Sequence, residues 1–104
     1  MFKLKIQIIQ KEMLVKYLVE FLGTFVFLSV ILSQGQALPI VIALAAVIFF
    51  GGSISGGHFN PAVSFMMHLK NVLPLEDFLF YAVSQMAGGF AALVFFNNFI
   101  KHTF

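Results

Sequence analysis

The stretch Ser53-Ile54-Ser55-Gly56-Gly57-His58-Phe59-Asn60-Pro61-Ala62-Val63-Ser64 interrupts an otherwise apolar chain and decides how the rest can fold. Glycines and small polar residues break the hydrophobic run here, so we do not expect the backbone to continue as a regular membrane helix. Asn60-Pro61 then has the pattern of a helix start, because Asn is a favoured N-cap and Pro fits the first helical position. The sequence therefore predicts a short helix that begins at Pro61.

This short helix cannot cross a bilayer. It can run to about Leu69 before Lys70-Asn71 and Pro74 interrupt it, which gives roughly 13 Å against a hydrocarbon core of about 30 Å. Because its residues are mostly apolar, a solvated surface helix is a poor alternative. We predict a re-entrant loop and half-helix over residues 54–69, entering and leaving on the same side of the membrane. Irregular backbone at that depth needs cover from protein or from a water-filled cavity.

The composition is that of a membrane protein. Of 104 residues, 61% are hydrophobic and 10% are charged, which excludes an ordinary soluble domain. Apolar runs predict three transmembrane helices at about 13–33, 36–53 and 78–100. With the half-helix, they make an all-α membrane domain over residues 13–104.

Residues 1–12 mix lysines with apolar residues, so we expect a short tail at the membrane surface. A cleaved signal peptide fits this region less well, because no small-residue cleavage site precedes Gly23-Thr24. All six basic residues are lysines, and most fall on one side of the predicted topology. On that side lie Lys3, Lys5, Lys11, Lys16 and Lys70; Lys101 falls on the other side. The positive-inside tendency therefore predicts a cytoplasmic N-terminus and entry of the re-entrant segment from the cytoplasm.

Chemistry of other kinds has little support in the sequence. There is no cysteine, so disulfides and thiol chemistry are excluded. His58, His68 and His102 do not have the spacing of metal ligands, and no serine, histidine and acid constellation suggests nucleophilic catalysis. The small net charge of +2 does not favour nucleic-acid binding. We predict neither an enzyme nor a cofactor, metal or nucleic-acid partner.

Glu20 lies inside the first predicted span, where an unpaired carboxylate costs about 2.5–3.5 kcal/mol. We expect Glu20 to brace the re-entrant loop, with the His58 side chain as its best partner and the backbone N–H groups of residues 55–59 as further donors. Partial hydration near the interface is the alternative, and a proton relay is disfavoured because one Glu and one His make a short relay. Gln85, in the third span, is expected to bond the loop or another helix.

The string Ser55–Ser64 resembles the first signature loop of the aquaporin, or major intrinsic protein, family. Glu20-Phe21-Leu22-Gly23-Thr24-Phe25 and Tyr81-Ala82-Val83-Ser84-Gln85-Met86-Ala87-Gly88-Gly89 resemble the family's first and third helices, in the right order and spacing. The likeness extends over roughly Tyr17 to Asn98. An isolated Asn-Pro-Ala is a weak signal, but the ten-residue string with both flanking matches is highly specific.

The resemblance implies a channel and a role for each matching residue. Asn60 would donate a hydrogen bond to passing water or a small neutral solute, and Pro61 and Ala62 would dock the half-helix tip against its mate. The carbonyls of Gly56, Gly57 and His58 would form a ladder of acceptors along the pore, and the half-helix dipole would oppose cations. The remaining implied pore residue is Ile40, near the position where the family's second helix lines the constriction.

The chain departs from the family pattern in two respects. Family members carry two inverted three-span halves, whereas this sequence holds the first half alone. It also lacks arginine, including the one that lines the family's constriction. We therefore predict a half-channel in the lipid bilayer that needs a complementary half, from a separate chain or the remainder of an interrupted gene. The resemblance further implies tetramers of pores.

The exposed half-pore leaves two alternatives, one for the assembly and one for the function. An antiparallel self-dimer is disfavoured, because the lysine asymmetry should insert all copies the same way. The alternative function is a non-conducting protein that assembles with full-length channels and modulates them.

Overall fold

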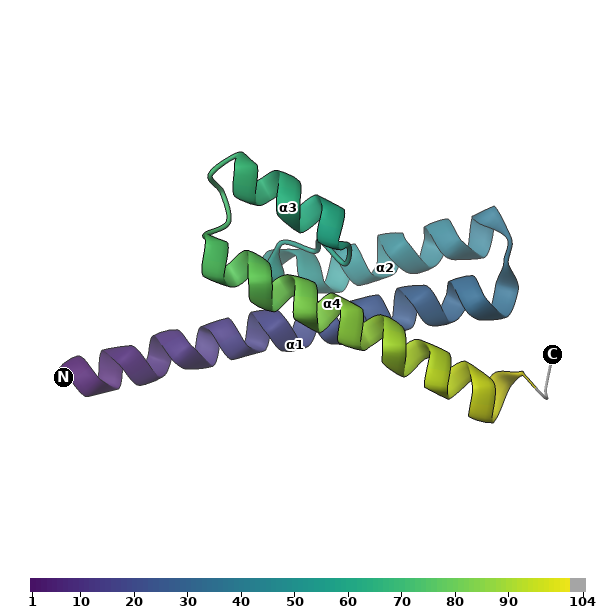
Figure 1. Ribbon diagram of the computed structural model, residues 1–104, viewed down its shortest axis with the longest axis horizontal. Helices are drawn as coiled ribbons and strands as arrows, with labels where there is room; N and C mark the ends of the chain where they lie inside the picture. The colour runs from purple at the N-terminus through teal and green to yellow at the C-terminus, as the bar shows by residue number, and fades with distance from the viewer. Residues whose placement is uncertain (102–104) are drawn as a thin grey trace.

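The structure, a computed structural model, describes residues 1–101, and these are organised as helices joined by short turns (Figure 1). The elements are α1 (Phe2–Gln34), α2 (Ala37–Ser55), α3 (Pro61–Leu69), α4 (Leu75–Phe95) and a π-helical turn, η1 (Phe96–Ile100). The predicted all-α class, with three long apolar helices and a short one, is confirmed. His102, considered above as a metal ligand, lies outside the described residues.

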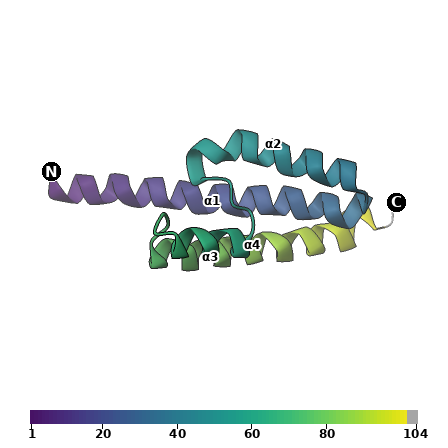
Figure 2. The same cartoon turned by 90° about the horizontal axis from the view of Figure 1, so that it is seen from above.

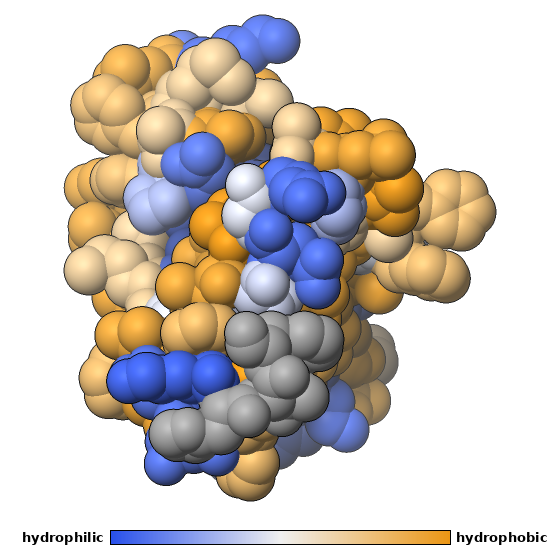
Figure 3. All heavy atoms as spheres, turned by 90° about the vertical axis from the view of Figure 1, so that its right-hand side faces the viewer, coloured by the Kyte–Doolittle hydropathy of each residue, from blue (hydrophilic) through white to orange (hydrophobic). Residues whose placement is uncertain are grey.

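Three helices within the described chain have the length and composition needed to cross a membrane: α1, α2 and the continuous Leu75–Ile100 segment. α1 and α2 are antiparallel and meet at a turn where Gly35 has φ 64°, a left-handed conformation that glycine adopts at little cost. Seen from the end that carries this turn, hydrophobic residues cover most of the outline, while hydrophilic residues form patches on the end face (Figure 3).

α1 begins at Phe2, well before Met13, where the first span was predicted to start. Hydropathy marks only the segment that suits lipid, whereas residues 2–12 are good helix formers without glycine or proline, so the helix continues past the apolar run. At about 1.5 Å per residue, the 33-residue helix is about 50 Å long. The position of residues 1–12 relative to a membrane stays a prediction.

α1 is the central helix, with α2 on one side and α3 and α4 on the other (Figure 2). The α1–α4 contact depends on a small residue, because a Cβ atom at Gly88 would lie 2.7 Å from the backbone oxygen of Phe21. Since α2 and α3 lie on opposite sides of α1, residues 56–60 must pass across that helix. The crossing brings the loop backbone against Glu20.

Candidate functional site

The carboxylate of Glu20 is the centre of the candidate site. Its side chain is fully buried and accepts four hydrogen bonds. Oε2 accepts from Ser55 Oγ at 2.7 Å and from the His58 backbone N–H at 3.1 Å. Oε1 accepts from the Phe59 backbone N–H at 2.8 Å and from Gln85 Nε2 at 2.8 Å. One side chain of α1 thus ties together the end of α2, the loop and α4.

The loop reaches this carboxylate through an unusual backbone. Gly56, Gly57 and Phe59 have φ values of 94°, 66° and 52°, in the left-handed region that side chains disfavour. With this backbone, the amides of residues 57–59 donate to Ser55 Oγ and to both Glu20 oxygens. Successive backbone N–H groups that converge in this way form a concave site for an anion. Here the occupant is the protein's own carboxylate.

The Phe59 side chain fixes the loop on the other side. It is only 2% exposed, and its ring fits between two glycines on facing helices, Gly23 on α1 and Gly51 on α2. A Cβ atom at Gly23 would overlap the ring, and one at Gly51 would lie 3.1 Å from Phe59 Cζ and 2.8 Å from Val19 Cγ1. The hydrogen bonds and the packed ring together hold Phe59 in a conformation that costs backbone strain.

His58 takes a different partner from the one expected. Its backbone N–H binds Glu20, but its imidazole Nδ1 lies 2.8 Å from Ser64 Oγ. Ser64, which is fully buried, also accepts from Gln85 Nε2 at 2.9 Å. The imidazole is directed to Ser64 because the loop's own amides and the Ser55 and Gln85 side chains already occupy the Glu20 oxygens. Gln85 therefore links Glu20 to the half-helix.

Tyr81 and Ser64 lie in the strings that resemble the family, but sequence reasoning gave neither side chain a role of its own. Tyr81 is 2% exposed and donates from its hydroxyl to the Ser55 carbonyl at 2.6 Å, across the end of α2. The signal that could have found it is helical spacing. Tyr81 and Gln85 are four residues apart on α4, so two polar groups share one face of an apolar helix.

The half-helix tip is built differently from the base of the loop. Asn60 is the N-cap of α3, and its Oδ1 accepts from the Ala62 N–H at 2.8 Å. Asn60, Pro61 and Ala62 are all exposed. The cap uses the amide oxygen, and the two amide N–H donors of Asn60 make no hydrogen bond within residues 1–101. Donors and a positive helix end are thus presented together at the tip.

A hollow of about 330 Å³ lies beside this tip. Residues of α1, α4 and the tip itself surround it: Thr24, Phe27, Leu28, Phe59, Asn60, Pro61, Gln85, Met86 and Gly89. The tip therefore faces open space on the side of α1 and α4 and does not pack into the core of this chain.

The structure brings most of the predicted site residues together, and Ile40 is the exception. Gly56, Gly57 and His58 lie in the loop, next to the tip. Ile40 lies in the first turn of α2, at the end opposite the loop. Within residues 1–101, no cluster of His, Cys, Asp and Glu residues has the makings of a metal site.

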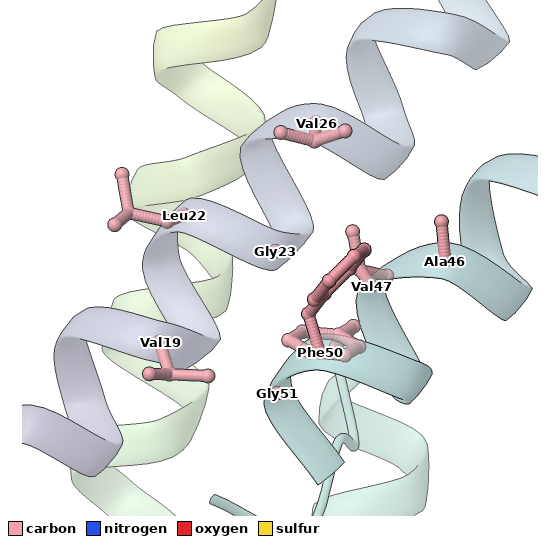
Figure 4. A pocket seen from close by; sticks show the side chains of 9 residues that line it. Val19, Leu22, Gly23, Val26, Ala46, Val47, Phe50 and Gly51 are labelled. Atoms are coloured by element: carbon pink, nitrogen blue, oxygen red, sulfur yellow. The ribbon is translucent and has the colours of Figure 1, made fainter. Parts of the chain in front are cut away.

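A second hollow, of about 370 Å³, opens between α1 and α2 and is shown in Figure 4. Its walls include Val19, Leu22 and Val26 on α1 and Val47 and Phe50 on α2, and Phe59 also lines it. These side chains are apolar, so this groove offers a packing surface and no polar chemistry. The chemistry of the site lies at the loop and the tip.

Known proteins are similar to this sequence. The profile of the major intrinsic protein family matches residues 7–103. The chain is similar to glycerol uptake facilitator protein-like 6 of Lactiplantibacillus plantarum, at 38% identity over 83% of this chain and 44% of the relative. It is also similar to human aquaporin-9, at 37% identity over 73% of this chain and 32% of the relative.

A further relative is aquaporin Z of Brucella melitensis, at 41% identity over 56% of this chain and 25% of the relative. The chain thus spans less than half the length of each of these relatives. No solved structure gives a significant match. Taken with the loop and the capped half-helix, the profile match over nearly all of the sequence shows that the chain belongs to the major intrinsic protein family.

Proposed function

We propose that this chain supplies one half of a transmembrane pore for water or another small neutral solute, and that a complementary half completes the pore. Membership of the major intrinsic protein family implies a channel for water or small solutes. The observation that carries the proposal for this chain is the contrast at the loop. Its base is held by Glu20, while the Asn60 tip is left exposed with free donors.

Asn60 is suited to guide a neutral solute. Its amide oxygen already accepts the cap bond from the Ala62 N–H. The side chain therefore offers its two N–H donors and has little capacity to accept a further hydrogen bond. A passing water or hydroxyl would therefore present its oxygen to Asn60. The positive end of α3 favours that same orientation and opposes a cation.

The exposed tip also supports the need for a second half. α3 is a nine-residue helix, about 13 Å long, so a tip directed inward from one membrane face would stop within the hydrocarbon core. Polar backbone exposed to lipid there costs several kcal/mol for each unsatisfied group. A complementary half seated on the hollow beside Asn60 and Pro61 would cover these groups and close the pore.

Co-reconstitution tests the proposal. The full chain would be placed in proteoliposomes alone, or with the C-terminal half of the Lactiplantibacillus relative as a surrogate complement. Stopped-flow light scattering would follow shrinkage under an impermeant osmolyte and re-swelling in glycerol. We expect the pair to raise water or glycerol permeability above that of empty vesicles and of either half alone. Permeability of the pair equal to that of empty vesicles would overturn the pore.

Two variants give the matched comparison. Asn60→Asp replaces the tip donors with carboxylate oxygens and should lower the permeability of the pair. Asn71→Asp makes the same change in the exposed turn after α3, where the residue has φ 66°, and should leave permeability unchanged. Equal effects of both would contradict a pore role for Asn60.

The non-conducting alternative predicts a different result. Addition of this chain to vesicles that hold the full-length relative would lower permeability, and Asn60→Asp would not alter that effect. Permeation by this chain alone would instead show that no second half is required.

A further inference from the structure

We take the hydrogen bond between Tyr17 and Asp77 as the marker of the level at which α1 leaves the membrane. The Tyr17 hydroxyl donates to Asp77 Oδ1 at 2.7 Å, and Asp77 lies in the first turn of α4. Tyrosine is enriched at membrane interfaces, and an acidic group at a span end belongs at the headgroup level. From Tyr17 to Gln34, α1 rises about 26 Å, close to the thickness of a hydrocarbon core of about 30 Å.

Beyond Tyr17, α1 therefore continues outside the hydrocarbon. From Phe2 to Lys16 it rises about 21 Å further, and Figure 1 shows this segment projecting past the rest of the bundle. Lys3, Lys5, Lys11 and Lys16 are exposed on it. No carboxylate pairs with these amines within residues 1–101.

Two of the lysines flank a groove. A hollow of about 290 Å³ is lined by Lys11, Glu12, Val15 and Lys16 of α1 and by Ile54 near the end of α2. Lys16 precedes Tyr17, so its backbone lies at the same level on the helix, and the backbone of Lys11 lies about 7.5 Å further out. Val15, which lies between Lys11 and Lys16 on α1, and Ile54, near the end of α2, supply an apolar wall beside the two lysines. The groove therefore combines two amines with an apolar wall.

We propose that this groove binds an anionic phospholipid, with Lys11 and Lys16 on the headgroup phosphate and the glycerol backbone with its ester groups against Val15 and Ile54. Lysines next to a membrane helix attract anionic lipid, and long lysine stems reach along apolar surface while the amine stays polar. This inference does not depend on the pore.

Charged groups of two helices surround the groove. On α1, Glu12 lines the groove and lies four residues before Lys16, so it competes with the phosphate for that amine. On α4, Glu76 and Asp77 lie in the first turn, but Asp77 is engaged by Tyr17. The groove itself keeps two positive charges against one negative charge.

Native mass spectrometry of the delipidated full chain in neutral detergent tests the proposal. The protein would be titrated with phosphatidylglycerol and, separately, with phosphatidylcholine. We expect tighter binding of phosphatidylglycerol, and an affinity about tenfold lower in the Lys11→Gln/Lys16→Gln variant. The matched control is Lys3→Gln/Lys5→Gln, which removes the same charge from the same segment away from the groove and should change the affinity less than about threefold.

Further arms make the outcome decisive. Glu12→Gln should raise the affinity, because it removes the competing carboxylate. Equal losses of affinity in the two double-lysine variants would show that the lipid binds to the basic segment in general and not to the groove, and would overturn the proposal. Equal affinity for the two lipids would also overturn it. Full competition by inorganic phosphate at comparable concentration would show a simple anion site without a lipid contribution, and would also overturn it. Far-UV circular dichroism confirms that each variant folds.

Discussion

The base of the loop and its tip, adjacent in sequence, are built in opposite ways. At the base, Ser55 and Phe59 are buried and bonded to Glu20. At the tip, Asn60 and Pro61 are exposed, and the only side-chain hydrogen bond found there within residues 1–101 is the helix cap. The base satisfies its polar groups internally, whereas the tip keeps donors unused.

This difference teaches how a short helix can be aimed without being enclosed. The Glu20 and Gln85 bonds fix the start of α3 through the backbone before it and through Ser64 within it, so the tip needs no contact of its own to be positioned. Substitutions at the base should therefore change stability, and substitutions at the tip should change function.

Glu20→Leu should have the largest effect. It leaves the N–H groups of His58 and Phe59 without an acceptor and removes one of the two acceptors of Gln85 Nε2, each at about 1–3 kcal/mol. This sum exceeds what is gained by removing a carboxylate from the membrane, which is at most about 3 kcal/mol. We expect a net loss of about 3–5 kcal/mol in the free energy of unfolding, measured by titrating detergent micelles with sodium dodecyl sulfate and following circular dichroism.

Glu12→Gln is the matched control, because Glu12 is an exposed carboxylate on the same helix. It should change the free energy of unfolding by less than about 0.5 kcal/mol. Unchanged stability of Glu20→Leu would mean that the carboxylate does not hold the base.

Gly23→Ala should have the next largest effect. The new methyl group would overlap the Phe59 ring, and overpacking of this kind costs about 1–3 kcal/mol. Gly52→Ala is the control, since its Cβ would lie 3.8 Å from Ile48 Cγ2 in ordinary contact. The same unfolding titration should show a loss for Gly23→Ala and no loss for Gly52→Ala. Similar losses for both would mean that the loss of stability comes from alanine in the helices and not from contact with the Phe59 ring between Gly23 and Gly51.

Tyr81→Phe should cost about 1–2 kcal/mol, because it removes the buried hydroxyl that donates to the Ser55 carbonyl at 2.6 Å. Tyr17→Phe also removes a hydroxyl, but the Tyr17–Asp77 bond is only partly buried, so Asp77 can be hydrated in its absence. The loss should therefore be smaller in Tyr17→Phe, as thermal unfolding in detergent would show. The reverse order would contradict the assignment of Tyr81 to the base.

The sequence was informative where local chemistry determines structure. The Asn60-Pro61 start and the break at Lys70-Asn71 are local signals, and the observed helix runs from Pro61 to Leu69. A carboxylate in an apolar span indicates a need for partners, and Glu20 has them. These inferences require only a few neighbouring residues, or the cost of a charge in lipid.

Other features depended on tertiary geometry. Which loop atoms meet Glu20 depends on the left-handed backbone at Gly57 and Phe59, and this conformation turns the His58 imidazole to Ser64. The space for the Phe59 ring requires two glycines on separate helices, Gly23 and Gly51. A single sequence does not reveal that these two positions face each other.

Asn60→Ser should have the smallest effect on stability and so tests the tip half of the comparison. Serine caps helices about as well as asparagine, so the bond to the Ala62 N–H is retained, and the free energy of unfolding should change by less than about 0.5 kcal/mol. Asn60→Ala removes the cap and should cost about 1 kcal/mol. Both lose the amide donors, so both should lower the permeability of the reconstituted pair, although only one lowers stability. If permeability followed stability across the two variants, the tip would act through the fold, and the separation between base and tip would fail.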